Sequence, residues 1–229
     1  MNLLILGRGK TGSLIAEVAS SRRHRVRVLS SAENAGTAAL TSDALAAIDL
    51  VIDFTTPAAA VANAEACIRA KKHLVVGTTG WYDQLPHLHE MVLAAKTGFL
   101  YGSNFSIGVN LFFEIAATAG SALKYDYSGQ IFERHHEHKK DAPSGTALTI
   151  QKIIRDASGP KKDELEITSF REGDVVGMHE VTFNSTCDRI YLCHDAKSRL
   201  GFAEGAVRAA EWLSGKTGFY DFRNIWREL

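Results

Sequence analysis

The amino-acid sequence predicts a two-domain α/β protein, in which an N-terminal parallel sheet is followed by an α+β domain built on a mixed, mostly open-faced sheet. Two observations predict this class. Short apolar runs alternate with helical patterns over residues 2–101, and beyond about Asn104 the segments become β-rich and alternate between apolar and polar residues. Alternating strands and helices are typical of a parallel sheet covered on both faces, whereas period-two alternation is typical of a sheet with one open face.

Five apolar runs predict the strands of the first domain. They lie at Asn2 to Leu6, Arg25 to Leu29, Leu50 to Phe54, His73 to Val76 and Phe99 to Tyr101. Thr56 and Pro57 open a helix over Ala58 to Lys71, because threonine caps a helix start and proline fits its first turn. Gln84 to Lys96 is the next amphipathic helix. The alternation of strand and helix is the order that parallel strands require.

The second domain begins with one helix and continues with four strands. The helix is expected over Ile107 to Leu123, and the strands at Tyr127 to Arg134, Leu165 to Phe170, His179 to Ser185 and Ile190 to His194. In the third strand Val181 and Phe183 point to one face while polar residues point to the other. A last amphipathic helix, Phe202 to Leu213, is expected to return to the first domain.

Composition and charge limit the classes of function. The 229 residues are 45% apolar, and 26 basic residues balance 26 acidic ones, so the net charge favours neither nucleic acid nor an acidic membrane surface. No apolar run approaches the roughly 20 residues that cross a bilayer, and the first residues lack the pattern of a signal peptide. Cys67, Cys187 and Cys193 show no disulfide or zinc spacing. We expect a cytoplasmic protein that binds neither nucleic acid nor membrane.

A glycine-rich turn directly follows the first strand. Gly7, Gly9 and Gly12 have the G-x-G-x-x-G spacing that lets backbone approach a pyrophosphate at a helix N-terminus. The spacing is a weak signal alone, but between a first strand and a helix it indicates a Rossmann-type dinucleotide-binding domain. The cofactor is therefore expected to contact the whole turn, which is Gly7, Arg8, Gly9, Lys10, Thr11 and Gly12.

Two later segments are assigned to the same cofactor. Gly77, Thr78 and Thr79 end another strand at the sheet edge where open parallel sheets bind ligands. The other segment comprises Ser103, Asn104, Phe105 and Ser106. It lies at the boundary between the two predicted domains, so it is expected to approach the nicotinamide or to form the hinge.

The residues after the second strand bear on the choice between NADPH and NADH. An acid usually binds the ribose hydroxyls there, but this strand runs into Ser30 and Ser31. Upstream stand Arg22, Arg23, Arg25 and Arg27. Serines near positive charge tolerate a ribose phosphate, which slightly favours NADPH, although a solvated helix end explains the arginines equally well. Glu33 is the candidate acid for NADH.

The densest group of chemical side chains lies between Glu133 and Thr146, which reads ERHHEHKKDAPSGT. Its histidines titrate near neutral pH and its lysines add fixed positive charge, so the segment indicates proton transfer to an anionic substrate. Metal binding by the histidines and a purely structural role are the alternatives. The neighbouring ammonium groups oppose a cation, so no metal is assigned. Lys139 is favoured over Lys140 because it shares a side with His135 in an extended stretch.

The same segment ends in a helix start that suits a carboxylate. Pro143 to Thr146 precedes an apolar helical pattern, and the free N–H groups of a helix N-terminus attract anions. Ser144 and Thr146 are candidate capping residues, and Ser144, Gly145 and Thr146 are assigned to substrate binding. We therefore assign a dinucleotide-binding domain to residues 1–105, completed by residues 200–229. A substrate-binding and oligomerisation domain is assigned to residues 106–199.

The run from Glu133 to Ala147 resembles the signature of the 4-hydroxy-tetrahydrodipicolinate reductase family of lysine biosynthesis. The resemblance covers most of the chain and includes the glycine turn, Asp53 to Thr55, Gly77 to Gly80, Asn104 to Asn110, Arg171 to Gly173, and Gly205 to Arg208 with Trp212 and Leu213. The glycine turn departs from the family's usual form, being one residue shorter and lacking its methionine. Ser30 and Ser31 replace the family's acidic and basic pair.

The resemblance implies NAD(P)H-dependent reduction of a cyclic dicarboxylic imine by a homotetramer. Carried over by position, His135 is the proton donor or acceptor and Lys139 the second proton donor. His136, Gly145 and Thr146 match substrate-binding positions, and Arg199 is a further candidate for the substrate's other end. Two other functions remain open, namely a two-domain dehydrogenase acting on an imino acid or semialdehyde, and a non-catalytic dinucleotide-sensing protein.

Overall fold

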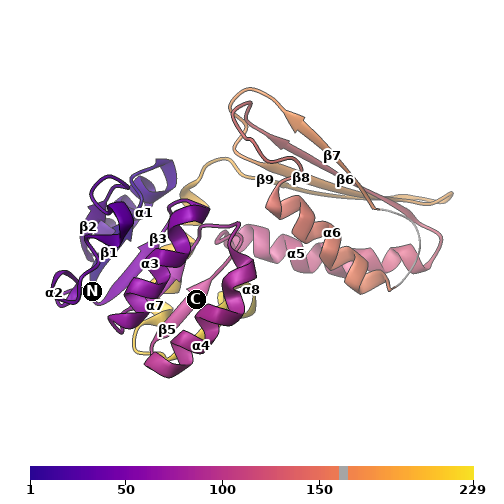
Figure 1. Ribbon diagram of the computed structural model, residues 1–229. Coiled ribbons are helices and arrows are strands. Elements are labelled where there is room, and N and C mark those ends of the chain that lie inside the picture. Colours follow the sequence, from indigo (N-terminus) through magenta and orange to yellow (C-terminus); the bar gives the residue numbers. More distant parts are fainter. Residues whose placement is uncertain (160–164) are drawn as a thin grey trace. The chain divides into compact units, whose positions relative to one another are not determined.

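The first sheet of the protein has six parallel strands in the spatial order β10-β5-β4-β3-β1-β2 (Figure 1). In this computed structural model, which describes residues 1–159 and 165–229, the strands are β1 Asn2–Leu6, β2 Arg25–Leu29, β3 Leu50–Asp53, β4 His73–Val76, β5 Gly98–Tyr101 and β10 Gly218–Asp221. Every residue of β3 is buried, because helices cover both faces of the sheet. The parallel arrangement brings the carboxyl ends of β1, β3 and β4 to one edge.

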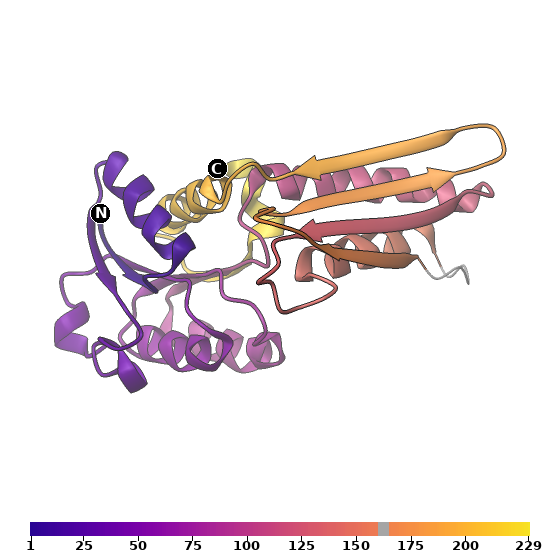
Figure 2. The same cartoon turned by 90° about the horizontal axis from the view of Figure 1, so that it is seen from above.

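Helices form a layer on each side of this sheet (Figure 2). The α-helices are α1 Lys10–Ser21, α2 Ser42–Leu45, α3 Pro57–Arg69, α4 Leu85–Ala95, α7 Leu200–Leu213 and α8 Phe222–Ile225. The 3₁₀ turns are η1 Ala35–Thr37, η2 Tyr82–Gln84 and η4 Trp226–Glu228. Helices α1 and α7 bury Ile15 and Ala206 against one face, and α3 and α4 bury Ala64 and Val92 against the other. Each face thus has its own apolar core.

The chain divides into two compact units, residues 1–107 with 200–229, and residues 108–199. Helix α7 therefore lies in the first unit, where it packs against α1. Strand β10 was not predicted from the sequence. Its Phe219 stacks on Phe99 of β5, with ring centroids 4.8 Å apart, so the strand extends the sheet and shields its edge. No helix among the described residues is long and apolar enough to cross a membrane.

The second unit contains a four-stranded mixed sheet in the order β7-β6-β8-β9. Its elements are α5 Ile107–Gly120, η3 Ser121–Lys124, β6 Ser128–His135, α6 Gly145–Ser158, β7 Glu166–Arg171, β8 Met178–Asn184 and β9 Arg189–Asp195. Strand β6 pairs parallel with β7 and antiparallel with β8, and β8 pairs antiparallel with β9. The predicted class, a parallel α/β domain followed by a mixed-sheet α+β domain, is confirmed.

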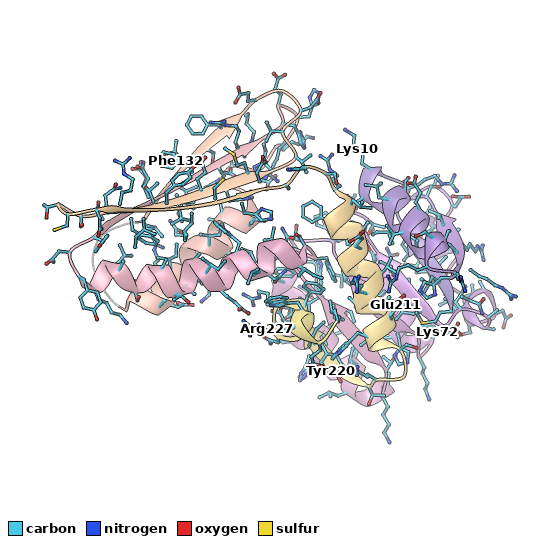
Figure 3. All side chains as sticks on the ribbon, turned by 180° about the vertical axis from the view of Figure 1, so that it is seen from behind. Lys10, Lys72, Phe132, Glu211, Tyr220 and Arg227 are labelled. Carbon is cyan, nitrogen blue, oxygen red and sulfur yellow. The ribbon has the colours of Figure 1, made fainter. Side chains whose placement is uncertain are left out.

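Helices α5 and α6 cover only one face of this second sheet (Figures 1 and 2). On the covered face, Val181 and Phe183 are fully buried, as their alternation predicts. Phe132, labelled in Figure 3, alternates with buried Ile131 and so belongs to the other face. Aromatic side chains are exposed on β7 and β9 of that sheet, among them Phe170 and Tyr191. Within this unit, α5 and α6 therefore cover one face of the sheet and leave the other face uncovered.

Candidate functional site

Two adjoining cavities, each of about 340 Å³, lie at the carboxyl ends of β1, β3 and β4. The first is lined by Gly9, Lys10, Thr11, Gly12, Phe54, Thr55, Pro57, Gly77, Thr78 and Thr79. The second is lined by Leu6, Gly7, Arg8, Gly9, Leu29, Ser30, Ser31, Asn34, Ala35, Gly36, Phe54, Thr55, Thr56, Ala59 and Asn63. Together they contain the whole predicted glycine turn and the predicted Gly77 to Thr79 segment. Figure 3 labels Lys10, the first residue of α1.

The glycine turn has no room for a side chain at Gly7 or Gly12. Gly7 has a φ of +106°, and a Cβ there would lie 2.3 Å from the carbonyl oxygen of Phe54. A Cβ on Gly12 would lie 2.0 Å from the carbonyl oxygen of Gly7. Helix α1 then begins at Lys10, with Gly9 as its N-cap, no side chain bonded to its first N–H groups and no acid in its first turn. These free N–H groups facing the cavity make an anion site suited to a pyrophosphate.

Buried Asp53 joins the loops around these cavities. Its Oδ1 accepts hydrogen bonds from the N–H of Thr55 at 2.9 Å, the hydroxyl of Thr55 at 2.7 Å and that of Thr78 at 3.0 Å, while Oδ2 accepts from Asn63 at 2.8 Å. Burial raises the pKa of Asp53, and the four hydrogen bonds oppose that rise. The carboxylate therefore holds the ends of β3 and β4 and the helix α3 in one arrangement.

The predicted segment Ser103 to Ser106 lines neither cavity. The Phe105 ring is buried in the core, 5.8 Å from Phe54 and 4.6 Å from Phe222 between ring centroids. Phe105 could therefore contact a ligand only through its backbone atoms. Asn104 accepts a hydrogen bond from the N–H of Ser106 at 2.9 Å, just ahead of α5. A cofactor role for this segment stays a prediction.

The end of β2 carries an acid and a cation side by side. Oε2 of Glu33 accepts hydrogen bonds from the N–H and the hydroxyl of Ser30 at 2.8 and 2.6 Å, and it lies 3.3 Å from the Arg8 guanidinium. The Ser30 hydrogen bonds hold the pKa of Glu33 below its usual value. Arg25 begins β2 at the opposite end of the strand, and Arg22 forms an ion pair with Glu211 of α7. Arg23 lies between these two in sequence, so three of the four arginines counted toward NADPH lie away from this end.

In the second unit, Glu133 is the centre of a buried polar cluster. Its Oε2 lies 2.9 Å from Nδ1 of His135, close enough for an ion pair although not aligned as a hydrogen bond. Its Oε1 accepts hydrogen bonds from Arg171 at 3.0 Å and from the N–H of Ser144 at 3.2 Å. Burial alone would raise the pKa of Glu133, but the interactions with His135, Ser144, Ser169 and Arg171 lower it below its ordinary value. The carboxyl group is therefore ionised at neutral pH.

Strand β8 contributes His179 to the same cluster. Its Nε2 lies 3.2 Å from the Ser144 hydroxyl and 4.0 Å from Oε2 of Glu133, and its ring meets that of His135 edge to face. Burial, with a contribution from His135, lowers the pKa of His179 to about 3. His179 is thus neutral at pH 7. Ser144 also caps α6, because its hydroxyl accepts from the N–H of Ala147 at 3.2 Å.

Lys139 joins this cluster through a chain of contacts. Its ammonium group lies 2.8 and 2.9 Å from the two carboxylate oxygens of Asp141. Partial burial would raise the pKa of Asp141, but the Lys139 ammonium outweighs it and lowers that pKa. The backbone carbonyl of Asp141 accepts from Arg171, which also binds Glu133. The structure therefore links the predicted His135 and Lys139 through three residues that were not assigned to the site, Glu133, Arg171 and Asp141.

The remaining predicted substrate residues surround the start of α6 and the preceding loop. Gly145 begins α6 and is exposed, and Thr146 follows it. The rings of His136 and His138 lie 6.4 Å apart, in the loop after β6. The first turn of α6 contains no acidic residue. The helix N-terminus therefore keeps its attraction for an anion.

Three groups of the cluster also have the chemistry of metal ligands. One ligand atom each of Glu133, His135 and His179 lies within 4.8 Å of the others. The guanidinium of Arg171 already neutralises the same carboxylate at 3.0 Å. A cation would have to compete with that charge and with the Lys139 ammonium, which also acts on His179. We therefore assign no metal to these residues.

Residues 1–105 match the family model described as "Dihydrodipicolinate reductase, N-terminus", and residues 108–226 match "Dihydrodipicolinate reductase, C-terminus". The chain belongs to the dihydrodipicolinate reductase family. This family assigns it an NAD(P)H-dependent oxidoreductase activity, a nicotinamide dinucleotide cofactor and a small-molecule substrate in lysine biosynthesis.

Relatives within the dihydrodipicolinate reductase family align over much or all of the chain. The 4-hydroxy-tetrahydrodipicolinate reductase of Christiangramia forsetii is 39% identical, covering 100% of this chain and 99% of the relative. That of Archaeoglobus fulgidus is 42% identical over 75% and 73% of the two chains. The dipicolinate-bound dihydrodipicolinate reductase from Paenisporosarcina sp. TG-14 shares the fold, with a TM-score of 0.75 and 24% identity over 98% of this chain and 99% of that one.

Proposed function

We propose that the chain reduces 4-hydroxy-tetrahydrodipicolinate to tetrahydrodipicolinate with NADPH or NADH. The observation that carries this proposal is the cluster in which His135 contacts a buried carboxylate beside the N-terminus of α6, whose first turn contains no acidic residue. A proton donor and an anion site within one cluster suit a substrate that has carboxylates and must take up a proton. The glycine turn in the first unit supplies the place for the dinucleotide.

Each residue of the cluster has a distinct part in this reaction. The bound dihydronicotinamide supplies the hydride. The reduction takes up one hydride and one proton, and the 4-hydroxyl group of the substrate leaves as water. His135 donates the proton that neutralises charge developing on the substrate ring, and Lys139 stabilises that charge and serves as second donor. The N–H groups of Gly145 and Thr146, oriented by the Ser144 cap, bind one carboxylate. His136 and Arg199 bind the other end of the substrate.

The test is NAD(P)H oxidation by the purified protein, with substrate generated freshly by a condensing enzyme. His135→Ala and Lys139→Ala should each lower turnover by about 10²- to 10⁴-fold, as loss of a general acid does. His138→Ala and the exposed Lys140→Ala are matched controls that should keep turnover. Wild-type protein that binds NAD(P)H without turnover would point to a sensor, and turnover only on other imino acids or semialdehydes would point to a different dehydrogenase.

Cofactor preference depends on Glu33 and Arg8 at the end of β2. A carboxylate there binds the ribose 2′-hydroxyl of NADH, whereas a guanidinium beside Ser30 binds the 2′-phosphate of NADPH. Because this chain has both, we expect it to use both cofactors. Glu33→Gln should raise the NADPH-to-NADH ratio of kcat/KM about tenfold, and Arg8→Gln should lower it by a similar factor. Equal ratios in all three proteins would show that specificity is set elsewhere.

The open face of the second sheet is our proposed site of self-association into a homotetramer. Phe170 is 43% exposed and Tyr191 54% exposed on strands of that sheet, and an apolar patch on an uncovered sheet face is a typical protein–protein contact. The three free cysteines suit a reducing compartment, which supports a cytoplasmic location. Light scattering during size-exclusion chromatography gives the assembly's mass, and a monomer mass would contradict the proposal.

A further inference from the structure

His135 is confined on both sides of its ring. Its Nδ1 lies 2.9 Å from Oε2 of Glu133. On the other side, its Nε2 faces Gly177, in the loop between β7 and β8, where an added Cβ would lie 3.0 Å from Nε2 and 3.2 Å from Cδ2. A side chain at position 177 would therefore crowd Nε2, and glycine avoids that contact. The two ring nitrogens have different surroundings, because Nδ1 faces a carboxylate and Nε2 faces a glycine.

Glu133 cannot turn away from His135, because its other oxygen is held. Oε1 accepts from Arg171 of β7 and from the N–H of Ser144, and the side chain is fully buried. Glu133 and His135 are also two residues apart on β6, so both side chains lie on the same face of the sheet. A fixed, ionised carboxylate beside Nδ1 favours the tautomer with the proton on Nδ1.

We propose that Glu133 is the positioning residue for His135, its carboxylate favouring the proton on Nδ1 so that Nε2, on the side of Gly177, exchanges the reaction's proton. This inference rests on the proposed reductase function and names a residue that acts through the proton donor. The other charged or titratable groups around the ring are Arg171 from β7, His179 from β8, and Lys139 with Asp141 from the loop after β6. His179 is neutral at pH 7, so it adds no positive charge beside the His135 ring.

The first experiment compares Glu133→Gln with wild type. We expect kcat to fall about 10- to 1000-fold, because the His135 ring loses the charged group that orients it. The KM for substrate should change less than about threefold, because the site for the substrate carboxylate at the start of α6 remains. Glu133→Asp should recover part of the activity, and exposed Glu137→Gln is the matched control that should retain it.

A second readout does not require turnover. Nitrogen-15 NMR of labelled histidine should show His135 as the Nδ1–H tautomer in wild type and as a mixture in Glu133→Gln. Gly177→Ala should keep the Nδ1–H tautomer yet lower kcat/KM about tenfold, because its Cβ occupies the space beside Nε2. If wild type shows no turnover, the proposed function fails while the tautomer measurement still decides the role of Glu133.

Two results would overturn the role of Glu133. One is a kcat in Glu133→Gln within threefold of wild type. The other is an unchanged His135 tautomer in that variant. The affinity for NAD(P)H should be unchanged in every variant, because the predicted cofactor residues lie in the first unit. An unchanged affinity would show that the variant is folded. If Glu133→Gln does not fold, Glu133→Asp and Gly177→Ala decide, since a normal kcat/KM in Gly177→Ala contradicts proton exchange at Nε2.

Discussion

Replacing Asp53 by asparagine tests whether one buried carboxylate organises the cofactor cavities. An asparagine can place its oxygen where Oδ1 lies and keep the three hydrogen bonds from Thr55 and Thr78. Its NH₂ group then faces the NH₂ group of Asn63, which now donates to Oδ2 at 2.8 Å. Asn63 cannot turn over without cost, because its own oxygen accepts from Asn34 at 2.9 Å. The variant therefore loses one buried charge-assisted hydrogen bond.

Such a bond contributes about 1.5–3 kcal/mol. Because burial raises the pKa of Asp53, removing its charge also relieves a desolvation cost, which moves the expected loss to the lower part of that range. We expect the free energy of unfolding to fall by about 2 kcal/mol. If the Thr55 and Thr78 loops lose order with it, the Kd for NAD(P)H rises about tenfold, since 1.4 kcal/mol corresponds to a factor of ten.

Two measurements separate these effects. Urea unfolding followed by circular dichroism gives the stability, and cofactor titration followed by tryptophan fluorescence gives the Kd. The indole of Trp81 donates to the carbonyl of Thr78 at 2.6 Å, so its emission reports on this loop directly. Exposed Asp43→Asn is the matched control. Ordinary surface substitutions change stability by roughly 0.5 kcal/mol or less. An Asp53→Asn variant that changed the free energy of unfolding by less than about 0.5 kcal/mol and the Kd by less than about twofold would refute the reasoning.

Three further outcomes follow from the second unit. The pKa of His179 is about 3 in the folded protein, against an ordinary value of 6.5. The stability that neutral His179 contributes is therefore complete above pH 6.5 and is lost as the pH falls toward 3, at up to about 1.4 kcal/mol per pH unit. In His179→Gln, the free energy of unfolding should fall less steeply with decreasing pH over this range. Ser144→Ala should cost about 1 kcal/mol through the lost cap on Ala147 and raise the substrate KM, with an unchanged NAD(P)H Kd. Phe170→Asp, measured by light scattering, should reduce the assembly mass if the open sheet face is the interface.

Five of the six strands of the first unit could be predicted, because they are short apolar or alternating segments that end at glycine or polar residues. The predicted range of β2 matches the structure, and β3 differs only in ending at Asp53 instead of Phe54. Strand β10 could not be predicted, because four residues near the C-terminus contain no periodic signal and form a strand only by pairing with β5. The helix expected over 107–123 ends as an α-helix at Gly120 and continues as a 3₁₀ turn.

The candidate site was predictable where its residues are adjacent in sequence, as His135, Lys139 and Ser144 are. Glu133 could have been found from its spacing, since residues two apart on a strand share a face. His179 was harder to find, because it occupies an inward position of a distant strand and only β6 pairing with β8 brings it close. The role of Asp53 depends on hydrogen bonds from three separate segments, which no local pattern contains.

The return of the chain to its first unit after residue 199 has a consequence for synthesis on the ribosome. Helix α7, which covers one face of the first sheet, and strand β10, which borders β5, are made last. Until they emerge, the apolar face around Ile5 and Ile15 stays open to water, so the cofactor-binding unit cannot finish folding before the inserted unit has been made. Nascent chains stalled before residue 200 should therefore recruit chaperones and fail to retain NAD(P)H.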